Sequence, residues 1–391
     1  MKNSLKRIIA AFLSLAVILS FAGCDLFGGN GEDKLLIEYV EENASIKNVI
    51  LIIGDGMGEA QLDAGELVYG EEFAFRDDFS KFFADTNSLN SDGIADEVTD
   101  SAASATALAT GILTENKNVG MDTVGNNLKT ILDIAADLGK ATGIVTNDYL
   151  TGATPAGFSA HTNNRNLDHE IVRSQATSGV DLLIGQYNSV YEEHLTDIEK
   201  EYKYFGSYDR DAILASESAQ LLCQFEIETQ AEGAVALKDA AGLAIDRLNA
   251  DEDGFVLVVE QAYIDKSCHS KDFEKAAFYA SSLNDTVNAA LEFAKGRNDT
   301  AIIVTADHET CGLAVSTDAE AYSKAFTTES GKEISYEFTA SYHTGTPVPV
   351  YVSGFTAYPE RLSTFSSAEK VKNCEIFLIM KDLVYCSKIE K

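Results

Sequence analysis

Acidic residues and histidines stand where several apolar segments of the chain end or begin. Those that follow the segments 49–53, 255–259 and 301–305, or precede 348–352, are Asp55, Glu260, Asp265, His269, Asp307, His308 and His343. Carboxylates gathered at one edge of a sheet repel one another unless cations neutralise them. Carboxylate oxygens and imidazole nitrogens are ligands of divalent metal ions. The sequence therefore predicts a site for divalent cations.

Ser101 stands at the start of an alanine-rich helical segment, 101–109. One interpretation is a helix N-cap, a common position for serine. The other is a nucleophile, because the exposed N–H groups at a helix N-terminus suit a phosphoryl group. A serine hydroxyl is a weak nucleophile at its ordinary pKa, so this second interpretation requires activation by a metal.

The glycines around Asp55 have the spacing Gly54-x-Gly56-x-Gly58. This spacing differs from the G-x-G-x-x-G pattern of dinucleotide-binding loops, and a carboxylate between the glycines would repel a pyrophosphate. We therefore expect these glycines to let the backbone turn sharply and present Asp55 to metal ions.

Short apolar segments alternate with helical ones along the chain. The predicted strands are 49–53, 141–146, 255–259, 301–305 and 348–352, and the predicted helices are 101–109, 128–138, 236–248 and 273–295. This order is typical of a three-layer αβα sandwich with a central, mostly parallel sheet. The polar segments 187–210 and 316–341 predict small insertions at the surface. Ligands of such sheets bind beyond the carboxyl ends of the strands, where the candidate ligands stand.

The composition supports a globular, strongly acidic protein. The 391 residues include 62 Asp and Glu against 30 Lys and Arg, for a formal charge of −32, and 45% are hydrophobic. A surface this negative repels a phosphate backbone, so we expect no nucleic-acid partner. Binding an anionic substrate would require local positive charge, which metal ions supply.

The first residues have the pattern of an export signal. Lys2, Lys6 and Arg7 precede the apolar segment 8–22, which is short for a membrane span. The end of this segment resembles a lipobox with Cys24 as the lipidated residue; the alternative is an ordinary signal peptide with an incidental cysteine. We expect a signal peptide at 1–23, a tether at 24–46 and a catalytic domain at 47–391. The expected location is outside the cytoplasm, anchored to the membrane of the cell envelope.

Five further cysteines leave at least one thiol unpaired: Cys223, Cys268, Cys311, Cys374 and Cys386. Spacing does not determine the pairing. Cys374 with Cys386 and Cys268 with Cys311 are the candidate pairs.

Several motifs together resemble the bacterial alkaline phosphatases. They are IGDGMG at 53–58, TDSAASAT at 99–106, ATPA at 153–156, AHTNNR at 160–165, Glu260 through IDK at 264–266 to His269, VTADH at 304–308 and HTG at 343–345. They run in family order through nearly the whole predicted catalytic domain. The resemblance implies hydrolysis of phosphate monoesters through a phosphoserine intermediate, and allows a homodimer.

The resemblance also implies a role for each matching residue. Ser101 is the expected nucleophile, and Arg165, oriented by Asp100, is expected to hold the phosphate oxygens. The expected metal sites are one zinc on Asp265, His269 and His343, a second zinc on Asp55, Asp307 and His308, and a magnesium on Asp55, Thr154 and Glu260. Phosphodiesterases, sulfatases and cofactor-independent mutases share the two-metal core and are the alternatives within the superfamily. A lipoprotein that only binds an ion or phosphate is the alternative from another class.

One position departs from the family pattern. Gly152 stands two residues before Thr154, where the family commonly has Asp or His. Lys266 resembles a lysine that pairs with the Asp variant. We therefore expect Lys266 to lack its partner and to approach the phosphate, and the third metal to be held less selectively.

Overall fold

A ten-stranded sheet forms the centre of the computed structural model, which describes residues 46–229, 231–353 and 370–386. The strand order is β17-β2-β16-β10-β1-β9-β5-β6-β8-β7. In chain order the strands are β1 (Asn48–Gly54), β2 (Ser80–Asp85), β5 (Ala141–Tyr149), β6 (Leu182–Gln186), β7 (Tyr202–Phe205), β8 (Gln220–Gln224), β9 (Phe255–Gln261), β10 (Thr300–Thr305), β16 (Val348–Ser353) and β17 (Val371–Lys372). All five predicted strands belong to this sheet.

Most neighbouring strands of the sheet run parallel, as predicted. β1 pairs in parallel with both β9 and β10, and the parallel pairing continues from β9 through β5, β6, β8 and β7. β16 is the exception, because it runs antiparallel to both β10 and β2. The sequence analysis predicted neither this reversal nor strands β2, β6, β7, β8 and β17.

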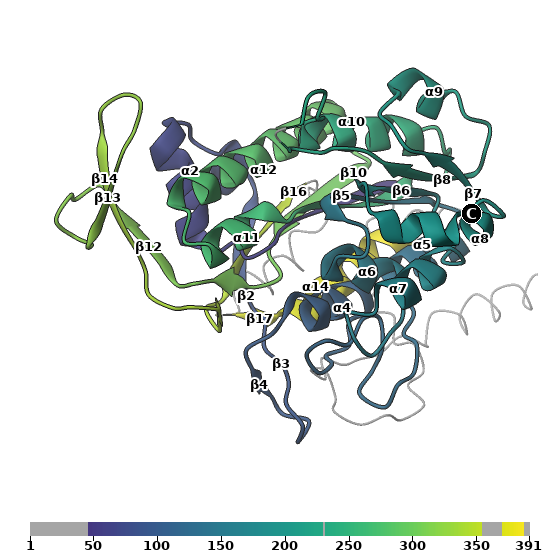
Figure 1. The fold of residues 1–391 in the computed structure, drawn as a ribbon, viewed down its shortest axis with the longest axis horizontal. Helices are drawn as coiled ribbons and strands as arrows, with labels where there is room; N and C mark the ends of the chain where they lie inside the picture. The colour runs from purple at the N-terminus through teal and green to yellow at the C-terminus, as the bar shows by residue number, and fades with distance from the viewer. Residues whose placement is uncertain (1–45, 230, 354–369, 387–391) are drawn as a thin grey trace, which may run out of the picture.

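Helices cover both faces of the sheet (Figure 1). In chain order they are α2 (Glu59–Tyr69), α3 (Ala74–Asp78), α4 (Ser101–Thr110), α5 (Ile131–Asp137), α6 (Ala153–Ser159), α7 (Asp168–Gln175), η1 (Ser189–His194), α8 (Leu195–Ile198), α9 (Arg210–Leu214), α10 (Leu237–Leu248), α11 (Tyr263–His269), α12 (Phe273–Ala294) and α14 (Asn373–Cys386). In Figure 1, α10 and α12 lie above the sheet, while α5, α6 and α14 lie below it. The predicted three-layer sandwich is therefore confirmed.

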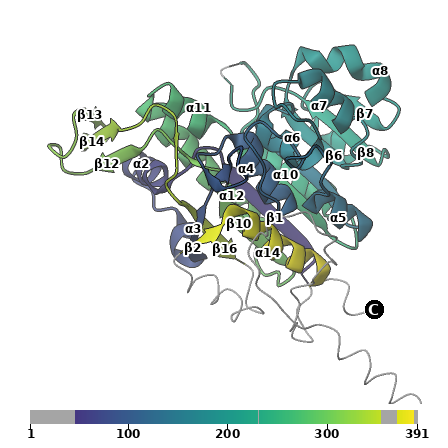
Figure 2. The same cartoon turned by 90° about the horizontal axis from the view of Figure 1, so that it is seen from below.

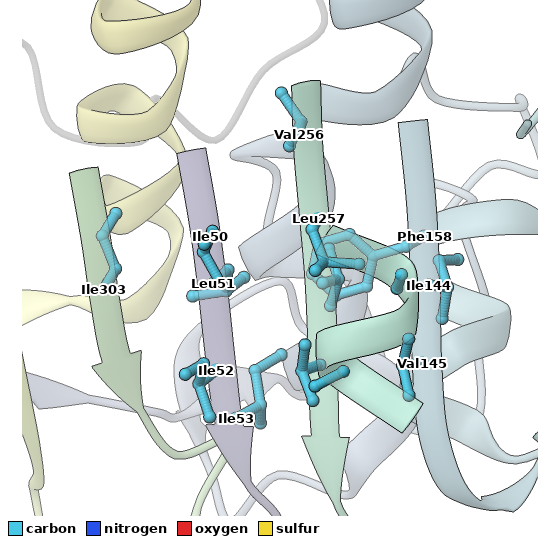
Figure 3. Packing of buried hydrophobic residues seen from close by; sticks show 14 of the residues in the cluster. Ile50, Leu51, Ile52, Ile53, Ile144, Val145, Phe158, Val256, Leu257 and Ile303 are labelled. Atoms are coloured by element: carbon cyan, nitrogen blue, oxygen red, sulfur yellow. The ribbon is translucent and has the colours of Figure 1, made fainter. Parts of the chain in front are cut away.

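The core lies between these layers. Every residue of β1, β9 and β10 is buried, because helices on both faces exclude water from a parallel sheet. Figure 3 shows the aliphatic side chains of β1, β5, β9 and β10 packed side by side, with Phe158 of α6 against them. This packing fixes the ends of three neighbouring strands, β9, β1 and β10, at one edge of the sheet.

Smaller sheets extend from the core. They are β3 (Ser88–Leu89) with β4 (Ala95–Glu97), β11 (Glu309–Thr310) with β15 (His343–Thr344), and the antiparallel sheet of β12 (Leu313–Ser316), β14 (Glu333–Phe338) and β13 (Lys324–Thr327). The three-stranded sheet contains most of the predicted polar insertion 316–341 and projects from one end of the molecule (Figures 1 and 2). Tyr336 holds it to the body, since its ring stacks on Phe273 of α12 with centroids 4.1 Å apart. The insertion 187–210 instead contains η1, α8 and β7, and β7 is the outermost strand of the large sheet.

The structure contradicts one of the two candidate cysteine pairs and does not test the other. Cys268 and Cys311 are both free and buried, so the candidate disulfide between them is wrong. Cys223 is also a free, buried thiol, and burial raises its pKa to about 12. Cys374 is disulfide-bonded. The side chain of its candidate partner Cys386 lies outside the described residues.

The predicted signal peptide, the lipidation site at Cys24 and almost all of the tether also lie outside the described residues. Within the described ranges, none of the helices combines the length and the hydropathy that crossing a bilayer requires.

Candidate metal centre and active site

The backbone joins the ends of β1 and β9 directly. The Asp55 amide donates to the carbonyl of Gln261 at 3.0 Å, and the Asp265 amide donates to the carbonyl of Asp55 at 2.9 Å. Gly56 has a φ of 74°, and a Cβ at this position would lie 2.7 Å from the Asp265 Cβ. Only glycine combines this left-handed backbone with such a close approach. The predicted sharp turn therefore brings Asp55 and Asp265 together.

One group of candidate ligands consists of Asp265, His269 and His343, whose ligand atoms all lie within 4.8 Å of one another. Asp265 and His269 are one turn apart on α11, and His343 comes from β15. The Nδ1 of His343 donates to the Thr99 carbonyl at 2.9 Å, which leaves its Nε2 with a free lone pair. This Nε2 lies 3.1 Å from the Nε2 of His269. The two nitrogens face the same position, and a metal ion there would bind both of them.

A second group consists of Asp55, Asp265 and His308, again within 4.8 Å of one another. The Thr310 hydroxyl has one proton, which it donates to Asp265 Oδ1 at 2.5 Å. It can therefore only accept from the Nδ1 of His308, 3.2 Å away. These hydrogen bonds assign the tautomer of His308 and leave its Nε2 without a proton. That Nε2 lies 3.2 Å from Asp307 Oδ2 and 3.6 Å from Asp55 Oδ1.

Two of the oxygens that face His308 have no hydrogen-bond partner. They are Asp55 Oδ1 and Asp307 Oδ2, and both are buried. Two buried carboxylate oxygens without a donor are costly. A divalent cation would satisfy both oxygens and could also take the lone pair of the His308 Nε2. The residues present therefore fit the metal that the sequence predicts, with Asp265 close to both groups and Asp307 close to the second.

The protonation of these ligands reflects their burial and mutual repulsion. Burial and the charges of Asp307 and Asp265 raise the pKa of Asp55 well above its ordinary value. Burial also raises the pKa of Asp307 to about 6 and lowers the pKa of His308 to about 4. Burial opposes ionisation of Asp265 too, but hydrogen bonds from His269 and Thr310 and the charge of His308 outweigh it and lower its pKa. In the absence of metal, protons compete for the same oxygens.

Ser101 opens α4 beside the second group. Its side chain is buried, and its Oγ lies 3.3 Å from the Nε2 of His308. The N-cap of α4 is Asp100, whose Oδ1 accepts from the amide of Ala103 at 3.0 Å. The N-cap interpretation of Ser101 is therefore wrong. The Ser104 hydroxyl, one turn along, donates to the carbonyl of Asp307 at 2.6 Å and fixes the helix start to the end of β10.

Arg165 reaches the same helix start from the loop after α6. Its Nη1 lies 3.2 Å from Asp100 Oδ2, and the two side chains are 31% and 20% exposed. The backbone positions the loop, because the amide of Arg165 donates to the carbonyl of Lys117 at 2.9 Å. A guanidinium held there has N–H groups free for an anion beside Ser101.

The predicted third group lies where β5 and β9 end. Thr154 Oγ1 is buried and has no hydrogen-bond partner, so it too is available to a cation. Glu260 is buried on β9 and accepts a hydrogen bond from the Thr146 hydroxyl of β5. Burial and the charge of Asp148 raise the pKa of Glu260 to about 7. The charge of Glu260 in turn raises the pKa of Asp55, the ligand expected in two sites.

The expectation that Lys266 lacks a partner is wrong. Its Nζ lies 2.5 Å from Asp148 Oδ1, and Asp148 belongs to β5. Burial lowers the pKa of Lys266, but the charge of Asp148 and its hydrogen bond outweigh this and raise it. The prediction considered only position 152, while the partner comes from four residues earlier.

Sequence reasoning missed Thr146, Asp148 and Thr310 as parts of this site. Thr146 falls inside a predicted strand, and Asp148 follows that strand within four residues of Gly152. Thr310 follows His308 by two residues, so the two side chains lie on the same side of an extended segment. This spacing was a signal in the sequence that Thr310 belongs to the site. Asp148 was a second signal, because it follows the β5 segment as other acidic residues follow β1, β9 and β10.

Comparison with known proteins decides the family. A family model described as alkaline phosphatase matches residues 46–190 and 217–371. The chain belongs to the alkaline phosphatase family. Alkaline phosphatase 3 of Bacillus subtilis is 32% identical over 338 residues, which cover 80% of this chain and 72% of that protein. The Escherichia coli alkaline phosphatase is 28% identical, over 79% of this chain and 81% of that protein.

Solved structures of alkaline phosphatases have the same fold. The alkaline phosphatase of the Antarctic bacterium TAB5 superposes with a TM-score of 0.73 and 27% identity, covering 88% of this chain and 98% of that one. A variant of that enzyme with magnesium bound is equally similar, at a TM-score of 0.73 and 28% identity. This alkaline phosphatase is thus an enzyme of the family that its motifs resemble, with the α/β sandwich of its relatives.

Proposed function

We propose that this alkaline phosphatase hydrolyses phosphate monoesters through a phosphoserine on Ser101, at a centre that holds two zinc ions and one magnesium ion. The observation that carries the proposal is the position of the Ser101 hydroxyl. It lies 3.3 Å from an imidazole nitrogen that also faces two carboxylates, with two of their oxygens unpartnered. The helix does not need Ser101 as its N-cap, because Asp100 already fills that position.

The proposed ligands divide into three sets. Asp265, His269 and His343 would hold one zinc, and Asp55 and His308 with Asp307 the second; Asp55, Thr154 and Glu260 would hold magnesium. Histidine with carboxylate is a usual zinc set, and hydroxyl with carboxylate oxygens is a usual magnesium set. When bound, such ions lower the pKa of coordinated hydroxyls and water and stabilise charge on the leaving oxygen.

The protein's own groups then perform the transfer. The Ser101 hydroxyl gives up its proton to solvent and its oxygen attacks phosphorus. The bond from phosphorus to the ester oxygen breaks, and the alcohol leaves after taking a proton from water. Arg165 donates two N–H groups to the phosphate oxygens, while Asp100 fixes the direction of its guanidinium. Water then attacks the phosphoserine, the Ser101 bond to phosphorus breaks, and inorganic phosphate leaves.

We also propose export and anchoring of the enzyme outside the cytoplasm through a lipid on Cys24. The support is the sequence of residues 1–24, with its basic start and apolar run. A homodimer is proposed on family resemblance alone. Replacement Cys24→Ala should move the enzyme from the membrane fraction to the soluble fraction of the envelope, and an unchanged distribution would contradict the anchor.

Hydrolysis of a chromogenic phosphate monoester beside its diester tests the proposed activity. We expect the metal-loaded enzyme to prefer the monoester and to contain zinc and magnesium by elemental analysis. Ser101→Ala should abolish acid-stable phosphate labelling and reduce the rate by at least about a thousandfold. Ser159→Ala, a buried helical serine on α6, is the matched control and should keep the rate. Preference for the diester, or a Ser101→Ala variant as active as the original, would overturn the proposal.

A further inference from the structure

Two histidines that belong to none of the ligand groups above lie against each other at the surface. His169 is the second residue of α7, and His194 is the last residue of η1, 25 residues further along the chain. The Nδ1 of His169 lies 3.0 Å from the Nε2 of His194, and the ring centroids are 5.3 Å apart. His169 is exposed and His194 is half-buried. Two ring nitrogens therefore face one position that solvent reaches.

The spacing of this pair matches that of the histidine pair in the metal centre. There, the Nε2 atoms of His269 and His343 are 3.1 Å apart, and the ring centroids are 5.1 Å apart. Two nitrogens bound to one metal at about 2.0 to 2.1 Å lie roughly 2.9 to 3.4 Å apart when the angle between them is about 90° to 110°. An N–H···N hydrogen bond has a similar length, so a metal ion and a shared proton compete for this position.

No other contact assigns the protons of the two rings. The outer nitrogens, His169 Nε2 and His194 Nδ1, form no hydrogen bond with any residue that the structure describes. Each imidazole can therefore carry its proton on the outer nitrogen and offer the lone pair of the inner one. Both inner nitrogens are then available as ligands at once.

The segments that carry the two histidines are fixed to each other. Tyr191 of η1 is buried, and its hydroxyl donates to the side chain of Gln175 on α7. Helix α7 and helix α8, which directly follows η1, lie side by side in both views (Figures 1 and 2). Ligands carried by packed elements bind a metal at a smaller cost in ordering than ligands on free loops.

The charges beside the pair balance, while the molecule as a whole is negative. The pocket next to His194 is lined by Arg173 and Lys200 and by Asp197 and Glu201, and Lys200 pairs with Asp197 at 2.6 Å. The formal charge of −32 raises the concentration of divalent cations at the surface. In the described part of the chain, groups of three ligands occur only at the metal centre. A metal on the histidine pair therefore has two protein ligands and exchanges with solvent.

We propose that His169 and His194 form a surface site for a divalent transition-metal ion, which cross-links α7 to η1. Imidazole nitrogen suits zinc, copper and nickel, whereas magnesium and calcium prefer oxygen ligands. The inference does not rest on the proposed function, because neither histidine belongs to its three ligand sets. The bound ion stabilises the folded protein, since only the fold brings the two ligands together.

Calorimetric titration of nickel into the zinc- and magnesium-loaded protein tests the site. We expect a binding event that His194→Gln and His169→Asn each weaken by at least about tenfold, since each removes one of two ligands. Both replacements place an amide near the lost ring nitrogen, so they keep a hydrogen bond between the side chains while removing the metal ligand. Thr177→Ala, in the pocket next to His194, is the matched control and should leave nickel binding unchanged.

Thermal melting provides a second measurement. Nickel at a hundred times its dissociation constant should raise the melting temperature of the original protein by roughly 3 °C more than that of either variant. If one variant folds poorly without nickel, the other removes a ligand of the same site and serves in its place.

The outcomes distinguish a metal site from a hydrogen-bonded pair. Equal nickel binding by the original protein and both variants would overturn the proposal. Loss of the binding event in both variants, with an unchanged rate of monoester hydrolysis, would support a site separate from the metal centre.

Discussion

The two ends of the metal centre neutralise their buried carboxylates in different ways. At one end, Asp55, Asp265 and Asp307 lie 3.2 to 3.6 Å from ring nitrogens of three histidines, and within the described ranges no lysine or arginine forms an ion pair with them. At the other end, Asp148 and Glu260 lie beside Lys266, which forms an ion pair with Asp148. The first end has free nitrogen lone pairs and unpartnered oxygens, while the second contains a cation of its own. The histidines therefore lie at the end whose carboxylates depend on metal for neutralisation. The lysine lies at the end where one carboxylate is neutralised without metal.

Asp265→Asn should have the largest effect, because this carboxylate is close to both groups of candidate zinc ligands. We expect the rate of monoester hydrolysis to fall by about a thousandfold or more, as when a metal ligand and the charge it supplies are lost together. Steady-state kinetics with zinc analysis provide the measurement. Asp197→Asn, on the exposed helix α8, is the control for loss of one carboxylate. If Asp265→Asn kept its full zinc content and its full rate, the two ends would not differ in their dependence on metal.

Chelation of metals should lower thermal stability more at pH 8 than at pH 5.5. Glu260 and Asp307 have pKa values of about 7 and about 6 in the fold, above their unfolded values near 4. A carboxyl with a raised pKa in the fold contributes stability below about pH 4 and loses it as the pH rises through 6 to 7. His308 acts in the opposite direction, but only below about pH 6.5, so the carboxylates decide the difference near pH 8.

Calorimetric melting of loaded and chelated protein at both pH values measures this effect. Metal at a thousand times its dissociation constant stabilises by about 4 kcal/mol, and protons on the ligands reduce this at low pH. A gap between loaded and chelated protein that is equal at both pH values would show that these carboxyls do not bind the metal.

Glu260→Gln should affect only the end that contains Lys266. We expect magnesium to be lost while zinc stays bound, with a fall in rate of about tenfold, since the ligands of the zinc groups remain. Elemental analysis beside kinetics checks both parts, and the exposed Glu292→Gln is the control. Loss of zinc together with magnesium would mean that the two ends form a single unit.

Gly152→Ala should have the smallest effect, on stability. The added Cβ would lie 2.9 Å from the Tyr149 carbonyl oxygen, so we expect a loss of about 1 to 2 kcal/mol in the free energy of unfolding. Denaturant titration measures it. Gly242→Ala in helix α10 is the matched control, because nothing lies within 4 Å of its Cβ position. That change should stabilise by roughly 0.5 to 1 kcal/mol. A stabilising Gly152→Ala would contradict the close approach of the added Cβ to the Tyr149 carbonyl and to Asp148 Oδ2, 3.2 Å away.

Much of the fold could be predicted from local pattern. The strands β1, β5, β9, β10 and β16 are apolar, β-branched segments that are buried on both faces, and such segments are visible in the sequence. Strand β7 was missed because it lies in a polar, tyrosine-rich segment at the edge of the sheet. The reversed direction of β16 was missed because the composition of a strand does not depend on the direction of its neighbours. The disulfide between Cys268 and Cys311 was wrong because spacing does not show that two thiols remain reduced side by side.

Residue types and their positions along single elements predicted carboxylates and imidazoles at strand ends and a serine at a helix start. The resemblance to the alkaline phosphatases added an arginine expected to hold a phosphate. The packing of distant segments placed an unprotonated nitrogen of His308 beside Ser101, and it placed Asp148 against Lys266, where Gly152 leaves room. Such contacts join residues from different strands and helices, and their distances are set by how those elements pack.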